Sequence, residues 1–202
     1  MNDARTRLER IAAVLQRHGV EYIVVGGIAA NLYGSKRQTE DVDLAYRREK
    51  ENLERLAAAL REITVSLRGA PPDLPFTIDA RALALGANFT FSTPLGDLDL
   101  LGWLEPIGDF EAVAKNAQTI EADGERIHVI SLDDLIRIKQ HLGRPKDLAT
   151  LAELLAIREE QERIRREERK SGSAQTTAPS PPPSPSPSPP GSSPPSPPPR
   201  SS

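Results

Sequence analysis

The chain has 202 residues, a net charge of −3 at pH 7 and no cysteine. The negative balance argues against a protein that grips nucleic acid through its overall charge, although it leaves room for a local basic groove. Without cysteine there can be neither a disulfide nor a zinc–thiolate site, and no apolar run approaches the length of a membrane span. The N-terminus has acidic residues and no apolar core, unlike a signal peptide, so we expect a soluble cytoplasmic protein with no membrane partner.

The first half of the chain alternates helical and strand patterns. Apolar residues from Leu8 to Leu15 recur at helical spacing, and Gly19 is placed to end that helix. We expect, in chain order, a strand at 20–25, a short helix at 28–33, a strand at 41–46, a helix at 48–61 and a short strand at 63–67.

The second half continues in the same manner. We expect a helix at 79–85, strands at 89–91 and 95–101, a helix at 109–116, and a hairpin of 119–121 with 126–130 around Asp123-Gly124. Ser131 is a good N-cap for a helix at 132–142, and after the break at Gly143 a last helix runs from about Lys146 to Lys170.

Alternating helices and strands over about 150 residues indicate a mixed α/β domain, which we place at residues 1–157. Residues 158–170 are almost wholly charged and are expected to form a helical extension in solvent. Residues 171–202 hold 13 of the 19 prolines and much serine. Such a segment lacks the apolar side chains that would offset the entropy of ordering, so we expect a disordered tail.

Two aspartates and two glycines form the most informative pattern of the chain. Asp41 and Asp43 lie one residue apart, so on a strand both carboxylates point to the same face. Like charges so close together repel, and a divalent cation between them is the commonest solution. Gly26 and Gly27 stand at a strand-to-helix turn, where backbone amides can hold a phosphate and glycine lets it approach closely. Phosphate and metal in one segment indicate nucleotide chemistry.

A third carboxylate comes from the strand at 95–101. Asp97 and Asp99 share one face of this strand, and Asp99 is the better candidate because leucines on both sides anchor it in the core. Three carboxylates on adjacent strands can hold two Mg²⁺ ions about 4 Å apart, and Mg²⁺ prefers hard oxygen ligands. Trp103, which follows this strand, is expected to pack in the core or at a rim rather than to stack on a base.

The series Gly26-Gly27, Arg37-x-Thr39-x-Asp41-x-Asp43 and Leu98-Asp99-Leu100 resembles the DNA polymerase β-like nucleotidyltransferase superfamily. Within it, the chain is most similar to small bacterial nucleotidyltransferases that include the toxins of type IV abortive-infection systems. The resemblance covers about residues 8–155, including SLDDLIRIKQHLGRPKDLATLAEL from Ser131 on. Many members of the superfamily carry Gly-Ser at this turn. This chain has Gly-Gly, which is common in the toxin-like and tRNA-modifying branches.

The resemblance implies a nucleotidyltransferase palm with a mixed β-sheet covered by helices. It assigns Asp41 and Asp43 to metal, Asp99 to metal and to activation of an acceptor hydroxyl, and the two glycines to the triphosphate. Two Mg²⁺ ions are implied as cofactors, with Mn²⁺ as a substitute. Arg37 is placed near the phosphates by its charge. Lys139 matches a cation that faces the site in such toxins. Arg144, Lys146 and Asp147 match the turn that follows the helix of Lys139.

The activity so implied is transfer of a nucleoside monophosphate from a nucleoside triphosphate to a hydroxyl of tRNA or of a protein. The chain would then be the toxin of a toxin–antitoxin pair, with a cognate antitoxin as partner. One alternative is a nucleotide- or partner-binding module on the same fold that has lost catalysis. A weaker one is an interaction scaffold that acts through the charged helix and the tail.

Overall fold

The computed structural model describes residues 3–71, 77–122 and 125–175. Contacts within it divide the chain into two compact units, Met1–Arg163 and Ile164–Ser202. All elements below belong to the first unit except the last part of α7, and the site discussed later lies within the first unit.

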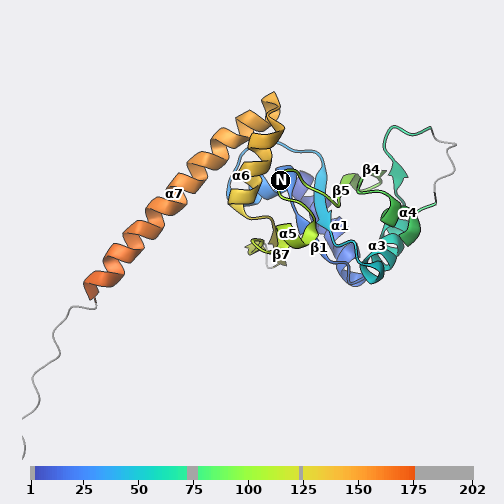
Figure 1. Cartoon of the computed structure of the whole chain (residues 1–202), viewed down its shortest axis with the longest axis horizontal. Helices are drawn as coiled ribbons and strands as arrows, with labels where there is room; N and C mark the ends of the chain where they lie inside the picture. The colour runs from blue at the N-terminus through green and yellow to red at the C-terminus, as the bar shows by residue number, and fades with distance from the viewer. Residues whose placement is uncertain (1–2, 72–76, 123–124, 176–202) are drawn as a thin grey trace, which may run out of the picture. The chain divides into compact units, whose positions relative to one another are not determined.

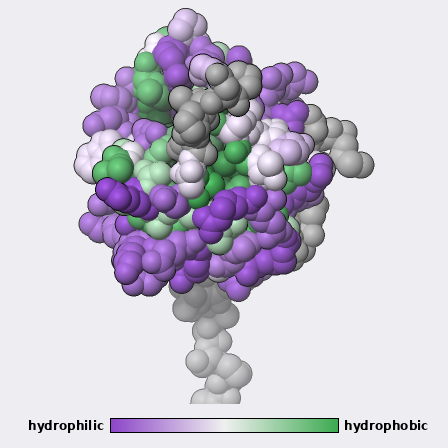
Figure 2. All heavy atoms as spheres, turned by 90° about the vertical axis from the view of Figure 1, so that its right-hand side faces the viewer, coloured by the Kyte–Doolittle hydropathy of each residue, from purple (hydrophilic) through white to green (hydrophobic). Residues whose placement is uncertain are grey.

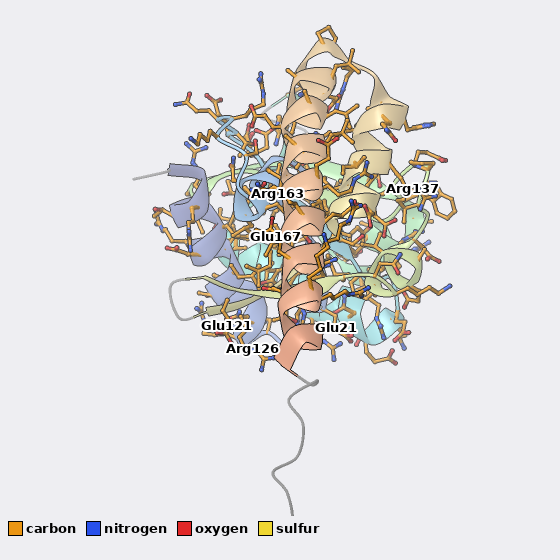
Figure 3. All side chains as sticks on the ribbon, turned by 90° about the vertical axis from the view of Figure 1, so that its left-hand side faces the viewer. Glu21, Glu121, Arg126, Arg137, Arg163 and Glu167 are labelled. Atoms are coloured by element: carbon orange, nitrogen blue, oxygen red, sulfur yellow. The ribbon has the colours of Figure 1, made fainter. Side chains whose placement is uncertain are left out.

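One mixed sheet has the strand order β3-β4-β5-β2-β1-β7-β6. β2 runs parallel to β5 and β1 parallel to β7, whereas the other neighbours are antiparallel. The strands are β1 (Tyr22–Val24), β2 (Val42–Tyr46), β3 (Ser66–Leu67), β4 (Asn88–Thr93), β5 (Gly96–Leu101), β6 (Gln118–Ala122) and β7 (Glu125–Val129). The predicted hairpin is confirmed, with Glu121 opposite Arg126 across β6 and β7 (Figure 3), while its turn lies outside the described residues.

Helices pack on this sheet and on one another. They are α1 (Asp3–Arg17), α2 (Gly26–Tyr33), α3 (Lys50–Ile63), α4 (Ala80–Leu85), α5 (Phe110–Ala114), α6 (Leu132–Leu142) and α7 (Pro145–Gln175). α1 and α4 contact α3, α2 contacts β2 and α6, and α5 contacts β1 and β2. Figure 1 shows α3 and α4 at one end of the sheet and α6 at the other. On the face shown in Figure 2 hydrophilic residues predominate, with apolar ones gathered near its centre.

The alternation of side chains along β2 and β5 anchors the middle of the sheet. Val42, Leu44, Leu98 and Leu100 are fully buried, and the aspartates between them point to the opposite face. Each buried aliphatic side chain contributes roughly 1.5–3 kcal/mol. The strands that carry the acids are therefore held firmly from their other face.

The helix α6 begins and ends where its sequence predicts. The Ser131 hydroxyl accepts a hydrogen bond of 3.1 Å from the Asp134 amide, and Gly143 closes the helix in the left-handed conformation with φ +60°. Such capping satisfies backbone groups that the helix itself leaves unpaired. Lys139, one of the candidate site residues, is thus carried on a helix with fixed ends.

Several predicted boundaries differ from the structure. α2 begins at Gly26 rather than at residue 28, because the chain turns directly from β1 into the helix with Gly26 at φ +64°. Asp41 lies just before β2 rather than within it, since the pairing of β2 with β5 begins at Val42.

The last helix is longer than predicted and runs to Gln175. Side chains from 162 to 170 are exposed, as the charged sequence suggests. The predicted tail at 171–202 begins inside this helix, and residues 176–202 lie outside the described ones. The division at residues 157 and 170 stays a prediction. Across the described ranges, no helix combines the length and the apolar character that a membrane crossing requires.

Candidate active site

Three aspartates from neighbouring segments meet in one cleft. β2 and β5 lie side by side with Asp43 directly opposite Asp99, and Asp41 immediately precedes β2. All three line a cleft of about 680 Å³. The structure thus brings together the carboxylates that the sequence predicts to act jointly, while their role in binding metal stays a prediction.

The two glycines lie against these acids. A Cβ on Gly26 would overlap the Asp43 carboxylate, and one on Gly27 would overlap the Thr39 hydroxyl. The Gly27 amide is 3.4 Å from Oδ2 of Asp43, to which it donates a hydrogen bond. Both glycines line the cleft. Glycine is therefore required at both positions because Asp43 and Thr39 pack against them. The sequence pattern, which indicates only the approach of a phosphate, does not reveal this reason.

Burial and nearby negative charge raise the pKa of two of these aspartates, Asp43 and Asp99. Burial, followed by the negative charge of Asp99, raises the pKa of Asp43 to about 6, whereas the Gly27 amide and the positive charge of Lys139 oppose the rise. Burial also raises the pKa of Asp99, with Arg68 opposing it. The site is a partly desolvated concentration of negative charge, which favours a bound cation.

Arg68, which no sequence pattern marks as a site residue, brings a positive charge to these acids. Its Nη2 donates to Oδ1 of Asp99 at 2.8 Å, its Nε lies 3.3 Å from Oδ2 of Asp97, and its Nη1 lies 3.9 Å from Oδ2 of Asp41. Arg68 directly follows the short edge strand β3. No local pattern marks it, because its partners lie about 30 residues away along the chain.

The donor chemistry of the site suits a hard divalent cation, since carboxylate oxygens are the ligands that Mg²⁺ prefers. As the side chains stand in the described part of the chain, no group of three or more histidine, aspartate or glutamate residues is arranged to hold a metal. Asp99 and Asp41 face the Arg68 guanidinium instead. A metal held by these acids would therefore share Asp99 and Asp41 with the Arg68 guanidinium.

A fixed cation lies on the α6 side of the cleft. Lys139 Nζ donates to Oδ1 of Asp147 at 2.8 Å, and Arg144 Nε donates to the other carboxylate oxygen at 2.5 Å. Burial alone would raise the pKa of Asp147, but these two hydrogen bonds outweigh it and hold the pKa below its ordinary value. Asp147 is fully buried, so it holds Lys139 in place while the lysine lines the cleft.

Arg37 also lines the cleft, in the loop that precedes Asp41. Glu153 of α7 fixes this loop: its Oε2 accepts hydrogen bonds from the Ser35 hydroxyl at 2.7 Å and from the Lys36 amide at 3.2 Å. Arg37 Nη1 lies 4.0 Å from the same carboxylate. All seven candidate site residues therefore border one cleft, including the nucleotide-binding candidates Gly26, Gly27, Arg37 and Lys139.

The cleft has an apolar part that the sequence analysis did not assign. Trp103 is half-exposed, at 50 %, and its Nε1 donates to Glu105 at 2.9 Å. It borders the cleft, so the expectation of a rim position is confirmed and a core position is wrong. The other apolar lining residues include Leu101, Leu104, Leu135, Ile138 and Leu142.

Comparison with known proteins agrees with this geometry. Residues 4–64 match the family model described as nucleotidyl transferase of unknown function, DUF2204. The matched segment contains both glycines and the pair Asp41 and Asp43. A search of curated proteins finds no match.

Solved structures resemble the chain at low sequence identity. The antibiotic-resistance factor ANT(2'')-Ia matches with a TM-score of 0.53 and 16% identity, covering 87% of this chain and 97% of that one. The lincomycin-bound lincosamide antibiotic adenylyltransferase LnuA matches with a TM-score of 0.51 and 16% identity, covering 75% and 96%. The chain has the nucleotidyltransferase fold. A second structure of ANT(2'')-Ia, in complex with adenylyl-2''-tobramycin, matches with a TM-score of 0.50 and 15% identity, covering 81% and 95%.

Proposed function

We propose that the chain is a metal-dependent nucleotidyltransferase that moves a nucleoside monophosphate from a nucleoside triphosphate to an acceptor hydroxyl. One observation carries the proposal: Asp43 and Asp99 lie opposite each other on parallel strands, with Asp41 and the Gly26-Gly27 turn in the same cleft. The fold, which the chain shares with an antibiotic-resistance factor and with a lincosamide antibiotic adenylyltransferase, supports the same proposal.

The basic and glycine-containing side of the cleft would bind the triphosphate. The N-terminus of α2 lies at the glycine turn, and a helix N-terminus favours negative charge. Lys139, Arg37 and Arg144 border the same cleft and bring positive charge to the phosphates. The hydrogen bond from Lys139 to Asp147 restricts the lysine side chain, which limits the entropy lost when the nucleotide binds.

The acidic side would prepare the acceptor. Asp41, Asp43 and Asp99 would hold divalent ions, which neutralise phosphate charge and stabilise the leaving pyrophosphate when bound. Asp99, whose pKa burial raises, takes the proton of the acceptor hydroxyl. The hydroxyl oxygen forms a bond to the α-phosphorus while the bond from that phosphorus to pyrophosphate breaks.

The acceptor we propose is a tRNA 3′ end or a protein hydroxyl, with the chain as the cytoplasmic toxin of a toxin–antitoxin pair. This follows from the resemblance of Gly26-Gly27 and of the segment around Lys139 to the toxin-like branch. A small-molecule hydroxyl is the second candidate, because lincomycin and adenylyl-2''-tobramycin occupy two of the similar structures. A binding module without catalysis is the third, and the ion pairs of Arg68 with the acids favour it.

One assay distinguishes these candidates. The full chain is incubated with Mg²⁺ and each of the four nucleoside triphosphates, labelled at the α-phosphorus, together with total bacterial RNA, a protein extract or a panel of aminoglycosides and lincosamides. Label in RNA or protein, lost in Asp41→Ala, supports the toxin proposal, and label only in the small molecules supports the second candidate. Nucleotide binding without label in any acceptor supports the binding module.

A further inference from the structure

The side chain of Arg68 extends from the edge of the sheet across strand β4 to reach the acids. The Arg68 backbone amide donates to the Thr90 carbonyl at 2.9 Å, which ties the residue to β4. From there Nη2 reaches the Phe91 carbonyl at 3.3 Å and Asp99 on β5 at 2.8 Å. Since β4 lies between β3 and β5, the guanidinium spans one full strand to arrive at the carboxylates.

The position is a partly buried one, in contrast to an ordinary surface ion pair. The Arg68 side chain is 30% exposed and that of Asp99 only 18%. Ion pairs between exposed side chains contribute little because water screens them, whereas a desolvated, charge-assisted hydrogen bond is stronger. Arg68 meets three carboxylates at once, on Asp41, Asp97 and Asp99.

We propose that Arg68 is a built-in countercation that competes with divalent metal for Asp99 and Asp41. The inference rests on the proposed function, because it concerns the acids that would hold the metal. As the side chains stand, the guanidinium donates a hydrogen bond to Asp99 and lies 3.9 Å from Asp41, so it occupies the space beside two of the three predicted ligands. Metal binding must therefore displace it, so Arg68 lowers the affinity for metal and sets the concentration at which the site fills.

A purely structural role for Arg68 makes the opposite prediction. If the arginine only oriented Asp99 for metal, its removal would leave the carboxylate misplaced and would weaken metal binding. If it competes with metal, its removal frees two carboxylates and strengthens binding. The sign of the change in metal affinity distinguishes the two roles without any measurement of catalysis.

The test is a titration of the full chain with Mn²⁺, without nucleotide, followed by electron paramagnetic resonance of the free ion. Arg68→Gln should bind Mn²⁺ roughly tenfold more tightly than the wild type, the size expected when a charge-assisted hydrogen bond no longer has to be broken. Arg68→Lys retains a positive charge without the planar fork, and its affinity should lie between the two.

Arg48→Gln is the matched control, because Arg48 donates to the carbonyls of Ala84 and Gly86 rather than to these acids. Its Mn²⁺ affinity should equal that of the wild type. Asp41→Asn should bind Mn²⁺ more weakly. Circular dichroism of each variant verifies that the chain is folded, and Mn²⁺ should raise the melting temperature of Arg68→Gln by more than that of the wild type.

Equal or weaker Mn²⁺ binding by folded Arg68→Gln would overturn the inference. If Asp41→Asn still bound Mn²⁺ more weakly than the wild type, and the wild type still transferred nucleotide, the proposed function would stand although the inference about Arg68 had failed. If neither the wild type nor Arg68→Gln bound Mn²⁺, with or without a nucleoside triphosphate, both the inference and the proposed function would fail.

Discussion

Replacing Asp43 with asparagine should make the metal-free protein more stable at neutral pH. In the folded chain, burial and then the charge of Asp99 raise the pKa of Asp43 from 3.8 to about 6. Each pH unit of such a rise costs about 1.4 kcal/mol of stability once the group is ionised, because the folded state then holds a charge that it disfavours. The whole rise corresponds to about 3 kcal/mol at most, and asparagine avoids this cost.

The pH dependence separates this effect from one of packing. At pH 4 the Asp43 carboxyl is protonated in the folded state and about half protonated in the unfolded state, so the wild type and Asp43→Asn should differ in stability by less than about 1 kcal/mol. As the pH rises through about 4 to 6, the folded state binds more protons than the unfolded state, and the wild type loses stability relative to the variant. The difference is complete above about pH 7.

Urea unfolding in EDTA, followed by circular dichroism at pH 4 and pH 8, measures the difference. Glu54→Gln serves as a control, since Glu54 lies on the exposed face of α3 and its replacement should change stability by less than about 0.5 kcal/mol. A variant that is no more stable than the wild type at pH 8, or that is stabilised equally at both pH values, would refute the electrostatic reasoning.

Three further predictions concern the same site. Gly26→Ala should destabilise the fold by more than about 2 kcal/mol in thermal unfolding, because Gly26 has a positive φ and a Cβ there would overlap Asp43. Gly19 is the control: it also has a positive φ, but its Cβ would make only an ordinary contact, so Gly19→Ala should cost only about 1 kcal/mol. Equal losses of stability in the two variants would contradict the predicted overlap with Asp43. Asp147→Asn should cost about 3–5 kcal/mol in urea unfolding, because Lys139 loses its buried partner, and a change below about 1 kcal/mol would show that the lysine finds another. Removal of divalent ions with EDTA should abolish transfer, with recovery on addition of Mg²⁺ or Mn²⁺; transfer that persists in EDTA would exclude the proposed metal dependence.

Much of the fold follows from local signals in the sequence. Alternation along β2 and β5 identifies both strands and the face on which their aspartates lie, because the period of a strand is two residues. The helix α6 is predicted to the residue because Ser131 and Gly143 cap its two ends. The strand order could not be predicted in this way, since pairing of β2 with β5 depends on contacts between distant segments.

The candidate site, like the fold, could be predicted from local sequence signals only in part. Asp41 and Asp43 could be found because two residues of spacing are a local feature, and Asp99 because leucines bracket it. Arg68 could not, because its side chain reaches Asp99 across 31 residues of chain. Glu153 fixes the Ser35 loop from 118 residues away, which likewise leaves no local trace. Side chains that neutralise and support the acids are thus the part that only the three-dimensional structure reveals.

The position of the label in the nucleotide provides the most direct test of the central claim. The full chain, Mg²⁺ and the responsive acceptor are incubated in parallel with a nucleoside triphosphate labelled at the α- or at the γ-phosphorus. Nucleotidyl transfer predicts that α-label appears on the acceptor and γ-label in free pyrophosphate, and that both signals vanish in Asp41→Ala. Label from the γ-position on the acceptor, or α-label transfer that persists in Asp41→Ala, would contradict the account.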